Sequence, residues 1–155
     1  DITSLDRNGN QDEDGIHQSV GDLRKLIDRE LDRGIPQKKI IIAGFSQGGA
    51  IAIYTALTLA SELGGLIALS TYMPLEKKFT DLAKNSKKLQ SSKLPIFFAH
   101  GSYDPLIPLS YGEKTKSFIE QFGYTVDWNE YPIEHSVSQR EIKDIGQWIS
   151  RVLEL

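Results

Sequence analysis

The residues Gly44-Phe45-Ser46-Gln47-Gly48 form a G-x-S-x-G pattern, the sequence signature of a serine held in a sharp turn between a strand and a helix. Apolar residues 40–43 precede the pattern, and a run of small and apolar residues, 49–54, follows it. Small neighbours permit the strained backbone that exposes such a serine. We therefore interpret Ser46 as a nucleophile.

A serine hydroxyl becomes a good nucleophile only when a neighbouring base takes its proton, and that base is oriented by a carboxylate. On folds with this kind of turn the three groups follow in the order Ser, Asp or Glu, His. Asp104 follows a predicted strand at residues 94–100, and His135 lies in a loop after a predicted strand at residues 125–131. The order predicts Asp104 as the orienting acid and His135 as the general base.

Other residues compete for these roles. His100 ends a predicted strand only four residues before Asp104, so we interpret it as a structural histidine rather than as the base. Asp104 taken alone could be a simple turn residue. Asp81 lies in a lysine-rich segment and Asp127 inside a strand, so neither is as well placed beyond a strand end.

Acyl transfer also needs hydrogen-bond donors for the oxyanion of the tetrahedral intermediate. The backbone N–H of Gln47, the residue after the nucleophile, is the expected first donor. The second donor is expected from a loop after an earlier strand, and nothing before residue 40 resembles such a strand and turn.

Strands and helices alternate along the chain, which predicts an α/β domain with a mostly parallel sheet. Residues 76–93 are rich in lysine and predict a solvated loop with one short helical turn. The expected strands are 40–43, 65–71, 94–100 and the edge strand 125–131, and the expected helices are 15–32, 47–63, 109–123 and 139–155.

Composition bounds the remaining possibilities. A chain of 155 residues with 39% hydrophobic content fits a single domain, 1–155, and a net charge of -3 provides no basic field for nucleic acid. The absence of cysteine excludes disulfides and thiolate catalysis. No stretch is apolar over the length that crosses a bilayer, so stable membrane insertion is not expected.

Metal and phosphate motifs are incomplete. Asp6, Asn8 and Asn10 alternate as in a calcium loop, but Gln11 stands where the glycine should be and His17 where the glutamate should be. The glycines after Ser46 lack the Lys-Ser/Thr of a phosphate loop. We expect no metal and no organic cofactor.

Together these segments resemble the carboxylesterase, lysophospholipase and acyl-protein thioesterase family of small α/β-hydrolases. The similar segments span nearly the whole chain: 11–16, 44–50, 72–75, 100–108 and 134–136. The resemblance implies Ser46, Asp104 and His135 as the catalytic triad, with the Gln47 amide in the oxyanion hole. It also implies an acyl-binding groove near Met73, Pro74, Leu75 and Ile107, although these four could equally be core residues.

The resemblance implies an α/β-hydrolase fold, with helices on both faces of the sheet, and a cytoplasmic serine esterase or thioesterase that works through an acyl-enzyme. The expected partners are small acyl esters, lysophospholipids or acylated proteins, and a homodimer is compatible with this interpretation. The alternative is an inactive hydrolase-like binding module, or a fragment that needs a missing N-terminal segment.

Family members look longer at the front, with early strands that this sequence lacks. We therefore expect residues 1–155 to be the C-terminal portion of an N-terminally truncated α/β-hydrolase domain. The nucleophile strand at residues 40–43 is then expected to be an exposed apolar edge, and the chain alone to be poorly stable.

Overall fold

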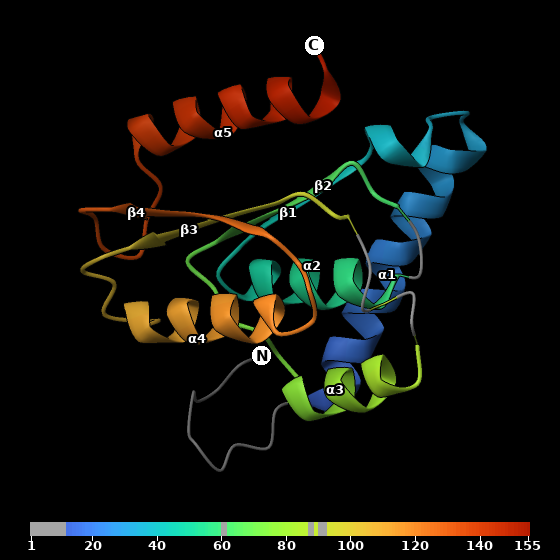
Figure 1. Ribbon diagram of the computed structural model, residues 1–155, viewed down its shortest axis with the longest axis horizontal. Coiled ribbons are helices and arrows are strands. Elements are labelled where there is room, and N and C mark those ends of the chain that lie inside the picture. The colour runs from blue at the N-terminus through green and yellow to red at the C-terminus, as the bar shows by residue number, and fades with distance from the viewer. Residues whose placement is uncertain (1–11, 60–61, 87–88, 90–92) are drawn as a thin grey trace.

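The computed structural model describes residues 12–59, 62–86, 89 and 93–155. Its centre is a parallel sheet of four strands in the order β1-β2-β3-β4. Figure 1 shows the strands running side by side between layers of helices. The strands are β1 (Ile41–Phe45), β2 (Gly65–Leu69), β3 (Ile96–Gly101) and β4 (Val126–Tyr131). The predicted α/β class with a parallel sheet is confirmed.

Helices cover both faces of this sheet, as predicted. In Figure 1, α2 and α4 lie on one face, α5 lies alone on the other, and α1 and α3 extend the first of these layers. A short 3₁₀ turn at Gln37–Lys39 precedes β1. The helices are α1 (Glu13–Asp32), α2 (Gln47–Thr58), α3 (Glu76–Lys84), α4 (Leu109–Glu120) and α5 (Gln139–Leu153).

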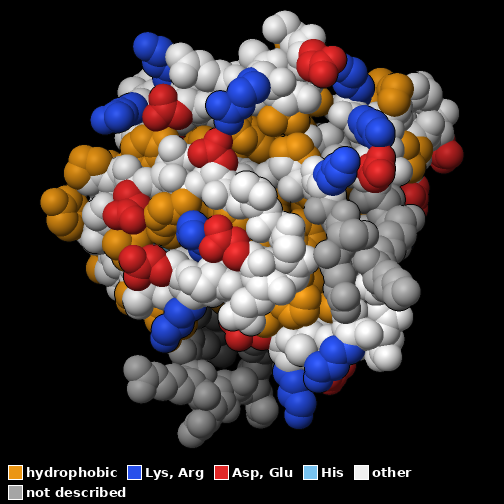
Figure 2. All heavy atoms as spheres, in the orientation of Figure 1, with side chains coloured by type: hydrophobic (Ala, Val, Ile, Leu, Met, Phe, Trp, Pro, Cys, Tyr) orange, Lys and Arg blue, Asp and Glu red, His pale blue; other side chains and the backbone are white. Residues whose placement is uncertain are grey.

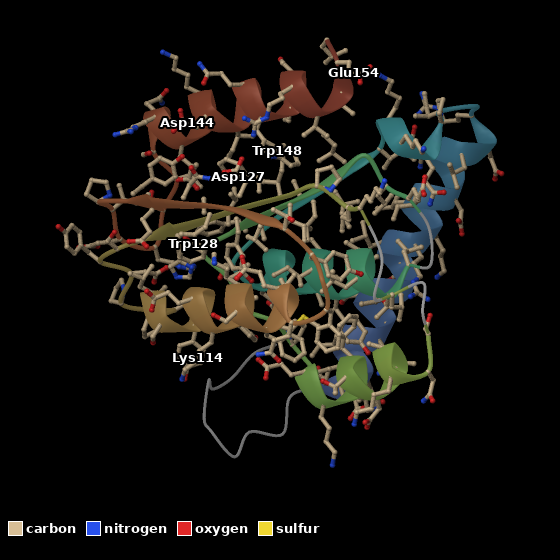
Figure 3. All side chains as sticks on the ribbon, in the orientation of Figure 1. Lys114, Asp127, Trp128, Asp144, Trp148 and Glu154 are labelled. Carbon is tan, nitrogen blue, oxygen red and sulfur yellow. The ribbon has the colours of Figure 1, made fainter. Side chains whose placement is uncertain are left out.

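The core is divided by the sheet into two parts. The larger part lies between the sheet and the helices α1, α2, α3 and α4, and it includes the fully buried Phe98 and Leu57. The smaller part lies under α5, where Trp148 points toward the sheet and its ring centroid lies 5.9 Å from that of Phe97 (Figure 3). Strands β2 and β3 are buried on both faces, which explains their continuous apolar sequences.

Local sequence signals set several helix boundaries. The Asp12 carboxylate accepts the N–H of Gly15 at 2.9 Å and caps the start of α1. A capping box begins α5, because the Ser138 hydroxyl accepts the Glu141 N–H while the Glu141 carboxylate accepts the Ser138 N–H. After α1, Gly34 adopts φ 86°, a conformation that favours glycine.

Two expectations about helices were wrong. The lysine-rich segment forms the nine-residue helix α3 and not merely one short turn. Phe79 and Ala83, one turn apart, are both fully buried, so α3 has a core-facing side that its charged residues conceal in the sequence. The other difference is that α2 ends at Thr58, five residues before the predicted end. Residues 60–61, 87–88 and 90–92 of these two segments lie outside the described residues, as do the calcium-like residues 6–10.

Strand β1 lies at one edge of the described sheet, the position expected for the nucleophile strand, and β4 lies at the other.

On the face shown in Figure 2, side chains of both charges are interspersed, and neither sign forms a continuous field. Among the described helices, none combines the length and apolar character required to cross a bilayer.

Candidate active site

The carboxyl ends of the four strands lie along one edge of the sheet, because the strands are parallel and in register. Phe45 at the end of β1 pairs with Leu69 of β2, and Gly101 at the end of β3 pairs with Tyr131 of β4. The segments that follow β1, β3 and β4 carry Ser46, Asp104 and His135. Residues far apart in the sequence therefore meet at one place.

Ser46 occupies the turn between β1 and α2 with φ 54° and ψ −123°, outside the conformations that residues with a side chain usually adopt. Gly44 makes room for this turn. A Cβ atom on Gly44 would lie 2.2 Å from the carbonyl oxygen of Gly48. The first glycine of the G-x-S-x-G pattern is thus explained by a backbone contact that only glycine at position 44 allows, whereas a Cβ atom on Gly48 would meet nothing within 4 Å.

The side chains of Ser46, His135 and Asp104 form a continuous hydrogen-bonded chain. His135 Nε2 lies 2.9 Å from Ser46 Oγ, and His135 Nδ1 lies 2.7 Å from Asp104 Oδ2. A carboxylate can only accept, so in the neutral imidazole Nδ1 carries the proton and Nε2 accepts from the serine hydroxyl. The structure brings together all three residues that the sequence singled out.

Asp104 is held by its own loop. Its Oδ1 accepts the backbone N–H groups of Leu106 and Ile107, both at 2.9 Å, and this leaves Oδ2 to His135. Burial raises the pKa of Asp104, but the hydrogen bonds from His135, Ile107 and Leu106 outweigh it and set the pKa below its usual range. The acid is therefore a carboxylate at neutral pH, even though its side chain is fully buried.

The loops that carry Asp104 and His135 are joined through their backbones. The Ser102 N–H donates to the Tyr131 carbonyl at 2.8 Å, and the Tyr103 N–H donates to the Ile133 carbonyl at 3.0 Å. Gly101 allows this approach, because a Cβ atom there would lie 2.4 Å from the Glu134 carbonyl oxygen. The distance between acid and base is consequently fixed by main-chain contacts.

The rings of Phe45 and His100 lie beside the hydrogen-bonded side chains of Ser46, His135 and Asp104. The Phe45 ring lies against His135, with centroids 4.7 Å apart, and limits how the imidazole can rotate. His100 is buried, and its Nε2 lies 2.8 Å from the carbonyl oxygen of Ile107. Its Nδ1 has no hydrogen-bond partner among the described residues. His100 therefore contacts the loop that carries the acid, and its Nε2 also lies 3.8 Å from Asp104 Oδ2.

The four residues expected near an acyl groove lie in different surroundings. Met73 is part of the main core, and its N–H donates to Thr115 Oγ1 at 2.8 Å. Pro74 is buried and Leu75, at φ 50°, is half-buried at the start of α3. Ile107 packs with Ala50, Tyr72 and Tyr111 in a small cluster beside the first turn of α2.

Sequence reasoning missed three residues that contact this site: Phe45, Thr71 and Tyr72. Phe45 occupies the variable position of the motif, so no pattern marked it. Thr71 donates a hydrogen bond to the Ser46 carbonyl at 2.6 Å, a contact between residues 25 positions apart. Tyr72 follows a buried strand, as core aromatics do, and only its contacts with Ala50 and Ile107 place it at the site.

The Gln47 N–H begins α2, so it has no acceptor within the helix and is available to a ligand. Within the described part of the chain, no three His, Asp or Glu side chains are grouped so that they could hold a metal ion.

The sequence model of phospholipases and carboxylesterases, α/β-hydrolases by their fold, matches residues 1–153. The chain belongs to the phospholipase/carboxylesterase family. Among curated relatives, a Neurospora crassa protein named acyl-protein thioesterase 1 is 39% identical over 93% of this chain. A Cryptococcus neoformans protein of the same name is 32% identical over 98% of the chain.

Solved structures of similar proteins share the fold. The crystal structure of Arabidopsis thaliana SOBER1 superposes with a TM-score of 0.82 at 29% identity, over 92% of this chain and 66% of that one. Zea mays acyl-protein thioesterase 2 superposes with a TM-score of 0.85 at 20% identity, over 97% and 70%, and supports the fold alone. The 155-residue chain spans 58% of the length of the Neurospora relative and 68% of the length of the Cryptococcus relative.

Proposed function

We propose that this protein is a serine hydrolase of carboxylic esters or thioesters that works through an acyl-enzyme. The observation that carries the proposal is the hydrogen-bonded chain from Ser46 Oγ through His135 to Asp104, with distances of 2.9 Å and 2.7 Å. The order of groups and their separations are those that base-assisted attack by a serine requires.

In the first step Ser46 Oγ attacks the acyl carbonyl carbon while His135 Nε2 takes the hydroxyl proton. The carboxylate of Asp104 keeps the proton on Nδ1 and stabilises the imidazolium that forms. The Gln47 N–H, at the positive end of the α2 dipole, donates to the developing oxyanion. His135 then protonates the leaving alcohol or thiol, and water releases the acid by the reverse sequence of proton transfers.

The substrate class follows from the names of relatives and is part of the proposal. Acyl-protein thioesterase is the name of several relatives, so a thioester of a protein cysteine is one expected substrate, beside small esters and lysophospholipids. We also propose action in the cytoplasm. The inactive binding module considered above is not favoured, because these relatives carry enzyme names and the three side chains are already hydrogen-bonded in catalytic order.

A fluorophosphonate probe tests the proposal directly, because it forms a covalent adduct only with an activated serine. We expect the complete, natively folded protein to be labelled, and Ser46→Ala to abolish labelling. Ser136→Ala is the matched control, since Ser136 is exposed and adjacent to His135 in the sequence. Labelling that survives Ser46→Ala, or no labelling of the folded protein, would exclude Ser46 as the nucleophile.

A further inference from the structure

Thr71 lies beneath the nucleophile turn, two residues after the end of β2. Its side chain is fully buried, and its hydroxyl donates to the carbonyl oxygen of Ser46 at 2.6 Å. The same oxygen also accepts the N–H of Ala50 at 3.2 Å, the first helical bond of α2. The hydroxyl of Thr71 is thus the shorter of two contacts that orient this carbonyl.

The contact is built into the packing. A Cβ atom added to Gly49 would lie 2.7 Å from both Cβ and Cγ2 of Thr71, so the threonine occupies the space that this glycine leaves. On the other side of the turn, the N–H of Ser46 donates to the Leu69 carbonyl at 2.9 Å. The segment 69–71 therefore holds both polar groups of Ser46's main chain.

The carbonyl of Ser46 and the N–H of Gln47 belong to one peptide group. That group is planar and trans, so its C=O and N–H point in opposite directions and rotate together. A donor that fixes the carbonyl also fixes the direction of the N–H. Hydrogen bonding to the carbonyl polarises the peptide as well and makes its N–H a stronger donor.

We infer that Thr71 is a positioning residue that aims the Gln47 N–H at the oxyanion. This inference rests on the proposed function, in which that N–H stabilises the tetrahedral intermediate. Thr71 does not touch the substrate, and it acts only through the Ser46–Gln47 peptide. When its hydroxyl is absent, the Ala50 contact alone leaves the peptide free to tilt.

The test is Thr71→Val, which removes the hydroxyl and keeps the shape. Thr55→Val is the matched control, because Thr55 lies on α2 and is fully buried, and its hydroxyl has no partner among the described residues. Thr71→Ser keeps the hydroxyl and is the rescue variant. All three are compared with the natural protein in ester hydrolysis, in inhibition by a trifluoromethyl ketone and in amide NMR spectra.

Complete loss of an oxyanion donor costs about 10²- to 10³-fold in kcat, so a misdirected donor is expected to cost about 10- to 50-fold. We expect this loss in kcat with an unchanged KM for Thr71→Val. The trifluoromethyl ketone, whose adduct carries an oxyanion, should bind more weakly by a similar factor. Thr71→Ser should recover to within about threefold, and Thr55→Val should match the natural protein in both measurements.

The Gln47 amide resonance gives a readout that does not depend on activity. We expect it to move in Thr71→Val and to stay in place in Thr55→Val. If the natural protein hydrolyses esters and Thr71→Val behaves like Thr55→Val in rate, inhibition and spectrum, the inference is overturned and the proposed function stands. If the Gln47 resonance moves but the natural protein is neither active nor labelled by a fluorophosphonate, the proposed function fails and the positioning of this peptide by Thr71 is supported.

Discussion

Replacing Asp104 by asparagine tests the tautomer on which the mechanism depends. In the protein, Oδ1 of Asp104 accepts the N–H groups of Leu106 and Ile107, and Oδ2 faces Nδ1 of His135. In Asp104→Asn the side-chain oxygen must stay with the two backbone donors. The amide NH₂ is therefore turned toward His135, where it can only donate.

A donor facing Nδ1 forces the imidazole proton onto Nε2, the nitrogen that lies 2.9 Å from Ser46 Oγ. Nε2 then has no lone pair that could accept the serine proton. The corresponding change in a serine protease lowers kcat by about 10⁴-fold, or about 5.4 kcal/mol, and we expect a loss of this size here. Because the two backbone donors keep their acceptor, the free energy of unfolding should change little at neutral pH.

The assay combines steady-state hydrolysis of a short-chain nitrophenyl ester, ¹⁵N NMR of the imidazole and thermal unfolding. Asp104→Ala is the structural comparison, since it leaves the buried Ile107 N–H without its acceptor at a cost of about 1–3 kcal/mol. Asp127→Asn is the matched control, because that carboxylate binds Arg151 at an exposed position. If Asp104→Asn keeps its rate within tenfold of the natural protein, the tautomer argument is wrong.

Four further perturbations follow from the packing and the charges. Gly146→Ala in α5 should raise the free energy of unfolding by about 0.5–1 kcal/mol in a urea titration, since nothing lies within 4 Å of the new Cβ. Gly112→Ala in α4 should lower it, because there the Cβ would lie 2.6 Å from a ring nitrogen of a buried histidine. Burial raises the pKa of Glu141, although the hydrogen bond from the Ser138 N–H opposes this shift. The contribution of the Glu141 carboxyl group to stability is therefore greatest below the ordinary glutamate pKa, and it is lost as the pH rises through the folded-state pKa. Glu141→Gln should therefore be more stable than the natural protein at pH 7 in thermal unfolding and lose this advantage near pH 4; equal stability at both pH values would contradict the argument. Tyr131→Phe, which removes the 2.8 Å hydrogen bond to Asp144, should lower the unfolding free energy by about 1 kcal/mol in urea, and no change would mean that water replaces the bond.

The sequence was sufficient to predict which residues meet at the site, and the reason is topological. In a parallel sheet every strand ends at the same edge, so residues that directly follow strands become neighbours whatever their separation along the chain. Ser46, Asp104 and His135 each follow a strand closely. Their approach therefore depends on element order, which hydrophobic patterns reveal.

What the sequence concealed depends on side-chain contacts. Helix α3 has only Phe79 and Ala83 as buried positions, and two buried residues among lysines give too weak a pattern to distinguish a helix from a loop. The hydrogen bond from Thr71 to Ser46 depends on a rotamer and on the space above Gly49. No periodicity records such a contact, because it belongs to the assembled fold.

The loop that carries Asp104 separates the role of its backbone from that of its side chains. The N–H groups of Tyr103 and Leu106 fix the loop, while their side chains are 68% and 63% exposed. Evolution, or saturation mutagenesis, can therefore change these two exposed side chains and leave the acid in place. The one replacement that the loop should reject at both positions is proline, which alone cannot supply the N–H.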